Sequence, residues 1–164
     1  MVGRHFRSVM IAFALAAFVA ATLAVTLRAE DAYLGAWKIA SATVAPWADP
    51  AARKPDPTEM NALVGKTVTF KAREIVGPRT FACKGPHYKL TRSTADMLFQ
   101  GAFGEMHDKD KSVDPATLAA SVGFQGKEWK VLETGCETEV DWHFVDPATI
   151  AIGLNDYVYV LKKQ

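Results

Sequence analysis

The chain has 164 residues, of which 49% are hydrophobic and 23% charged, and its formal net charge is +1. This length excludes two ordinary domains, because one domain takes ~100–200 residues. The apolar content excludes a disordered chain, and the balanced charge excludes a strongly basic nucleic-acid-binding protein.

The first predicted element is an uncharged apolar segment over residues 9–27 that follows Arg4 and Arg7. A basic start, an apolar run and small residues are typical of a signal peptide. A helix of this length also nearly spans a bilayer core, so a retained inner-membrane anchor is the alternative. We expect residues 1–29 to direct export to the periplasm or elsewhere outside the cytosol. Residues 30–164 then form one domain of net charge −2, with no expected nucleic-acid partner and membrane contact only through the amino-terminal segment.

The domain is predicted to consist of short strands and two short helices. The expected strands cover residues 33–44, 66–71, 74–82, 87–92, 128–134, 137–145, 150–154 and 157–162, with a break or bend at Gly77-Pro78 in the third. Asp56 and Asp114 are each followed by proline, which is typical of a helix start, and Gly65 and Gly123 are suited to the helix ends. Residues 94–100 favour one or two helical turns, whereas the polar stretch Gly104–Asp114 predicts an exposed loop.

These elements predict a mainly β fold. Loop lengths favour antiparallel pairing, and a sheet of about eight strands tends to close because closure removes exposed edges. An eight-stranded barrel holds either a packed interior or one small ligand. We therefore expect an antiparallel β-barrel of about eight strands with two short helices.

Gly35-Ala36-Trp37, on the first predicted strand, resembles the G-x-W motif of lipocalins and related calycin barrels. In that family the tryptophan closes the barrel base, and a basic side chain from the last strand packs over it. The resemblance implies this role for Lys162 or Lys163. The chain is also similar to small exported proteobacterial proteins of unknown function that carry G-x-W and one cysteine pair. Some lipocalins bind small apolar ligands and others act as enzymes, inhibitors or assembly factors, so the resemblance alone does not select a function.

Cys83 and Cys136, 53 positions apart, are the two cysteines of the chain. In an exported domain such a pair is usually a disulfide. The alternatives are free or redox-active thiols, or a zinc site with His87 and His143, which has the right ligand count but no recognised spacing. We expect the disulfide, with no metal and no other cofactor.

The aromatic side chains are the best lead to a function. Trp47, Tyr88, Trp142 and Tyr157 combine an apolar ring with a polar tip, as many ligand pockets do. The alternative is that such rings fill the barrel interior. Trp47 lies in a proline-rich loop, where it would either cover a pocket at the barrel mouth or plug the barrel end. The favoured function is non-enzymatic binding of a small, partly apolar ligand.

Two other function classes stay open. The sequence contains no G-x-S-x-G, P-loop or H-E-x-x-H motif. Asp141 and His143 alternate onto one strand face, where they would form either the acid–base pair of a hydrolase or isomerase, or a solvated polar stripe. The stretch Gly104–Asp114 would serve a protein–protein module of the cell envelope, such as an inhibitor or assembly factor.

Overall fold

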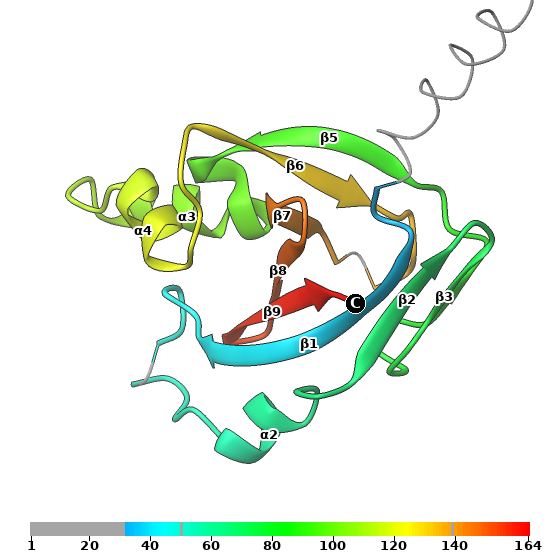
Figure 1. Cartoon of the computed structure of the whole chain (residues 1–164). Helices are drawn as coiled ribbons and strands as arrows, with labels where there is room; N and C mark the ends of the chain where they lie inside the picture. Colours follow the sequence, from blue (N-terminus) through cyan, green and yellow to red (C-terminus); the bar gives the residue numbers. More distant parts are fainter. Residues whose placement is uncertain (1–31, 50, 139) are drawn as a thin grey trace, which may run out of the picture. The chain divides into compact units, whose positions relative to one another are not determined.

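The structure, a computed structural model, describes residues 32–49, 51–138 and 140–164. Within these residues, nine strands form one antiparallel sheet that curls into a half-barrel (Figure 1). The strands are β1 (Gly35–Val44), β2 (Thr67–Lys71), β3 (Glu74–Val76), β4 (Cys83–Lys84), β5 (Lys89–Thr94), β6 (Glu128–Glu133), β7 (Trp142–Asp146), β8 (Thr149–Leu154) and β9 (Tyr157–Lys163). The helices are α2 (Pro57–Asn61), the short 3₁₀ helix η1 (Ala95–Met97), α3 (Leu98–Lys109) and α4 (Pro115–Ser121).

The predicted signal or anchor segment, residues 1–29, lies outside the described residues. In the part of the chain that the structure describes, no helix has the length and apolar character needed to cross a membrane. Tyr33–Gln164 form one compact unit, to which the following description refers.

The strand order follows the chain almost throughout. It runs β4-β3-β2-β1-β9-β8-β7-β6-β5, so that strands adjacent in sequence are paired, except that β4 and β5 are the two sheet edges. The first and last strands pair with each other, from Trp37 opposite Lys163 to Val44 opposite Tyr157. This order is that of an up-and-down barrel opened between β4 and β5.

We call the gap between β4 and β5 the seam. Residues 85–88 run across it and are hydrogen-bonded on both sides. The Gly85 amide donates to the Arg73 carbonyl oxygen at 2.9 Å, and the His87 amide donates to the Thr134 carbonyl oxygen at 2.7 Å. Backbone hydrogen bonds to a connecting segment thus replace direct strand pairing at this point.

The prediction of a mainly β, antiparallel, barrel-like fold is confirmed at the level of a curled half-barrel. The ninth strand arises at the break expected at Gly77-Pro78 in the predicted strand over residues 74–82. Gly77-Pro78 ends β3 after Val76, since proline cannot donate to the sheet, and β4 forms separately at Cys83. The expected strand 137–145 is also too long, because β7 begins only at Trp142.

Both predicted helices are present. Asp56 caps α2 by accepting from the Thr58 amide at 2.8 Å. Asp114 caps α4 by accepting from the Ala116 and Thr117 amides. The prediction of an exposed loop over Gly104–Asp114 is wrong for residues 104–109, because α3 continues to Lys109, and is confirmed for residues 110–114, which connect α3 to α4. Its polar residues line the outer side of the helix.

Two apolar clusters lie on opposite faces of the sheet. In β9, Tyr157, Tyr159 and Leu161 belong to the interior cluster. Val158, between them, belongs to the outer cluster together with Phe103 of α3 and residues of α4. Figure 1 shows α3 and α4 lying together on one side of the sheet. This helical layer explains why β9 is apolar on both faces.

Candidate functional site

The sheet interior is filled by aromatic and aliphatic side chains in contact. The Trp142 ring lies 4.8 Å from Phe70 and 5.3 Å from Phe81, both edge-to-face. Trp37, Phe70, Trp142 and Ile152 are each at most 2% exposed and share one cluster. Trp142, predicted to contact a ligand, therefore contacts other core rings.

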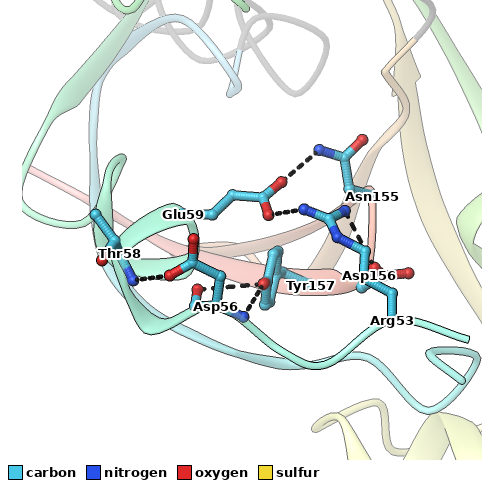
Figure 2. Close-up of polar contacts among 7 residues, drawn as sticks. All are labelled: Arg53, Asp56, Thr58, Glu59, Asn155, Asp156 and Tyr157. Carbon is cyan, nitrogen blue, oxygen red and sulfur yellow. Dashed lines mark hydrogen bonds and ion pairs between the residues drawn. The ribbon is translucent and has the colours of Figure 1, made fainter. Parts of the chain in front are cut away.

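Tyr157, another predicted ligand residue, joins the interior to the segment before α2 (Figure 2). Its hydroxyl accepts from the Asp56 amide at 2.9 Å and donates to the Asp56 carbonyl oxygen at 3.2 Å. Around it, polar side chains of this segment and of the β8–β9 turn form a network. Its members are Arg53 with Glu59 and Asp156, and Asn155 with Glu59. This network fastens the α2 segment to the end of the curled sheet.

Trp47 lies in the outer cluster, apart from the other predicted ligand residues. Its indole Nε1 donates to the Asn155 carbonyl oxygen at 2.9 Å, and its ring lies 5.0 Å from Phe99 and 5.9 Å from Phe103. A Cβ atom at Gly153 would approach the Trp47 ring to 3.0 Å. Trp47, which lies in the β1–α2 loop, thus packs against β8 and α3.

Tyr88 lies at the seam. Its ring contacts Tyr33 at 4.8 Å, and its hydroxyl donates to the Lys71 carbonyl oxygen at 2.8 Å. Burial, and secondarily Tyr33, raise the pKa of Tyr88 to about 12. The four aromatic residues predicted to bind a ligand therefore do not converge on one site.

The residues of the G-x-W motif lie at one end of β1. Gly35 has φ +111°, a conformation that favours glycine. Trp37 is fully buried, and its Nε1 donates to the Tyr33 carbonyl oxygen at 2.8 Å. Of the two lysines that the resemblance offered, Lys163 lies over the Trp37 ring, with Nζ 5.3 Å from the centroid. Lys162 instead donates to Thr149 Oγ1 at 2.6 Å.

The Cys83–Cys136 disulfide is present and joins β4 to the β6–β7 connection. It therefore crosses the seam, with a Cα–Cα distance of 6.0 Å. Because both sulfurs are in the disulfide, the alternative zinc site has no thiolate ligands. Among the described residues, no group of three or more His, Cys, Asp or Glu side chains is placed to hold a metal ion.

Beside the disulfide lies a pocket of about 430 Å³, which we call the seam pocket. Its lining residues come from α3, from the end of β6 and from the segment before β7. They are Gln100, Glu133, Thr134, Gly135, Cys136, Val140 and Asp141. The volume falls within the range of small-molecule sites, ~300–1,000 Å³.

Two carboxylates of different character face the seam pocket. Glu133 accepts from Thr91 Oγ1 at 2.9 Å and from Lys89 Nζ at 3.2 Å, and these partners lower its pKa. Asp141 is half-buried, and desolvation, followed by repulsion from Glu133, raises its pKa. Within the described residues, no hydrogen bond or ion pair is found for the Asp141 carboxylate. Among the described residues, no cationic side chain therefore pairs with this pocket carboxylate.

Gln100, which forms part of the pocket wall, lies in a left-handed turn at the start of α3. Phe99, Gln100 and Gly101 have φ values of +53°, +60° and +85°, so three successive residues are left-handed at the start of α3. The Phe99 amide donates to Nε2 of His143 at 3.1 Å. Nothing in the sequence beyond Gly101 indicates such a turn, because phenylalanine and glutamine rarely adopt it.

The structure does not bring Asp141 and His143 together in one open site. Asp141 lines the seam pocket, whereas His143 is 1% exposed and lies between the Phe99 and Phe124 rings. The alternative interpretation, a solvated polar stripe, is wrong for His143, because this side chain is buried. The reason is that α3 and α4 cover this face of the sheet, which the strand pattern alone does not show.

Comparison of the chain with protein families, with curated proteins and with solved structures finds no match. No family is therefore assigned.

Proposed function

We propose that this protein is a small-ligand-binding protein whose ligand, a partly apolar organic cation, occupies the seam pocket. The observation that carries the proposal is the half-buried Asp141 carboxylate, which lacks a cationic partner in the described structure and whose pKa is raised by burial and by Glu133. A ligand ammonium group beside it would offset both effects and form a charge-assisted hydrogen bond.

The other walls of the pocket suit the remainder of such a ligand. Val140 and Cys136 are apolar lining residues of the pocket, while Gln100 and Thr134 are polar ones. This mixture of apolar surface with a few polar anchors is typical of ligand sites. The sheet interior is a weaker candidate, because its aromatic side chains already contact one another.

Benzylamine and benzyl alcohol test this proposal, since they share a ring and differ in charge. We expect benzylamine to shift the amide resonances of Thr134, Gly135 and Val140 in an NMR titration, with binding that strengthens as pH rises through the pKa of Asp141. Asp141→Asn should weaken binding about tenfold or more, because it removes a charge-assisted hydrogen bond.

The matched control is Asp108→Asn, which removes the same charge from an exposed site on α3 and should leave binding unchanged. Equal affinity for benzyl alcohol and benzylamine would refute the requirement for a cation. Absence of any shift around the pocket with either compound would refute the site itself.

We also propose that the half-barrel is a lipocalin-like variant of the calycin architecture. The pairing of β1 with β9, the position of Trp37 after Gly35 and the lysine over its ring support this reading. The seam and the α3–α4 layer depart from that pattern. An experimental structure in which β4 and β5 belong to two different sheets would contradict it.

Finally, we propose that the protein is exported, with residues 1–29 as a signal peptide or, alternatively, an anchor. The basic and apolar pattern of this segment and the disulfide support the proposal. Mass spectrometry of protein recovered from fractionated cells tests it. A processed, disulfide-bonded chain outside the cytosol is the expected result, and a full-length reduced chain in the cytosol would contradict it.

A further inference from the structure

His143 makes one defined hydrogen bond at the base of the α3 turn. Its Nε2 receives the Phe99 amide hydrogen at 3.1 Å, so this nitrogen must be unprotonated. In the neutral imidazole the proton then lies on Nδ1, which is buried and has no hydrogen-bond partner among the residues that the structure describes. The site therefore holds one specific tautomer of a neutral ring.

The turn that this bond supports is unfavourable on its own. A left-handed conformation is sterically unfavourable for any residue other than glycine, and both Phe99 and Gln100 adopt it. The bond from the Phe99 amide is a tertiary contact at the first of these residues. Gln100, the next residue in the turn, lies in the wall of the seam pocket.

The surroundings of the imidazole are apolar. It packs against the Phe99 and Phe124 rings, and its cross-strand neighbours are Val131 on β6 and Ala151 on β8. Burial alone lowers its pKa to about 4, with no contribution from any charged group. Titratable residues also lie on the elements around the ring. They are Glu128, Lys130 and Glu133 on β6 with Lys127 just before it, Asp146 on β7 with Asp141 just before it, and Glu105, His107, Asp108 and Lys109 on α3.

We propose that His143 is a positioning residue for the seam pocket: its neutral imidazole, by accepting the Phe99 amide hydrogen, holds the left-handed turn that places Gln100 in the pocket wall. The proposal rests on the proposed function of that pocket. Protonation converts Nε2 into a donor that faces another donor, so the bond breaks, the turn relaxes and the pocket loses one wall. The pocket is thereby coupled to the protonation of a residue that does not line it.

The test compares the wild type with His143→Gln, because glutamine offers an acceptor oxygen that does not titrate. In the wild type, the hydrogen-exchange protection factor of the Phe99 amide should fall about tenfold between neutral pH and about pH 4, as expected for loss of one hydrogen bond. In His143→Gln it should stay constant over this range. His87→Gln, at an exposed histidine, is the matched control and should behave as the wild type does.

A second measurement keeps the proposal testable if glutamine disturbs folding. Nitrogen-15 chemical shifts of the wild-type His143 ring report the tautomer directly, and a proton on Nε2 at neutral pH would overturn the proposal. Equal protection of the Phe99 amide in neutral and protonated protein would overturn it too.

Benzylamine binding separates this inference from the proposed function. Protonation of Asp141 also weakens binding at low pH, but it acts equally in the wild type and in His143→Gln. A larger loss of affinity in the wild type than in His143→Gln supports the role of His143, and an identical loss contradicts it. If benzylamine fails to bind at any pH, the proposed ligand is wrong, whereas the exchange measurement still decides the role of His143 in the turn.

Discussion

At the residue scale, Lys163 makes a cation–π contact with Trp37. Its ammonium group lies over the fully buried indole and is attracted by the negative face of the ring. Lys163→Ala should lower the free energy of unfolding by ~0.5–1 kcal/mol, and Lys163→Arg should retain most of it. Urea unfolding followed by tryptophan fluorescence measures the change. Lys127→Ala, at an exposed lysine without such a contact, is the control, and an equal loss in both variants would contradict a specific interaction.

His143 makes stability depend on pH in a defined direction. Burial lowers its pKa from 6.5 to about 4, so between these values the unfolded chain takes up a proton that the folded chain does not. Stability should therefore fall as pH decreases from about 6.5 to about 4, by about 3 kcal/mol in total. Urea unfolding across this range should show the loss in the wild type and not in His143→Gln. Parallel curves for the two proteins would show that His143 is not the group responsible.

Individual residues were predictable where their signal is local. The caps at Asp56 and Asp114 follow from the residue type and the proline after it, and the cysteine pair follows from composition. The burial of His143 was not predictable, because it depends on helix α3, more than thirty residues earlier in the chain. The pairing of Gln100 with Asp141 in one pocket has the same long-range origin.

At the scale of elements, the left-handed turn at the start of α3 lowers the stability of the fold but places the Gln100 side chain in the pocket wall. Gln100→Gly should raise the free energy of unfolding by up to about 1 kcal/mol, because glycine adopts this conformation without a steric penalty. The same change removes a side chain from the pocket wall and should weaken benzylamine binding. Thermal and urea unfolding, with the NMR titration, measure both effects.

Gly101→Ala provides the opposite change in the same turn. Its φ of +85° suits glycine, so alanine should lower the free energy of unfolding by roughly 1–2 kcal/mol. Destabilisation by both substitutions would show that the glutamine side chain contributes more to stability than the strain removes.

The elements that the sequence predicted well are those with a strict pattern and clear ends. Strands β2, β8 and β9 match their expected ranges closely, since alternating or continuous apolar residues are bounded by turn residues. Helix α3 was missed because Gly101 and Gly104 are poor helix formers and its exposed residues are charged. The helix forms because tertiary contacts stabilise it. Phe103 is fully buried. Gly104 packs so closely on η1 that a Cβ atom there would lie 2.9 Å from the Asp96 carbonyl oxygen.

At the scale of the whole molecule, the disulfide closes a sheet that hydrogen bonds leave open. It constrains a loop between positions 53 apart, for which chain entropy gives about 4 kcal/mol. The double substitution Cys83→Ser with Cys136→Ser should lower the free energy of unfolding by that order. It should also raise hydrogen exchange first at Gly85 and His87, whose amides cross the seam. Uniform exchange changes over the entire sheet would contradict a local role in closing the seam.

The pairing of β1 with β9 has a consequence for the order of events during synthesis. The first strand has one neighbour, β2, available early, but its other edge stays open until residues 157–163 have been made. The sheet therefore remains two separate four-stranded antiparallel runs, β1–β4 and β5–β8, until β9 joins them. The two halves of the sheet can share one core only after β9 has been made, which places the completion of the tertiary structure late in synthesis.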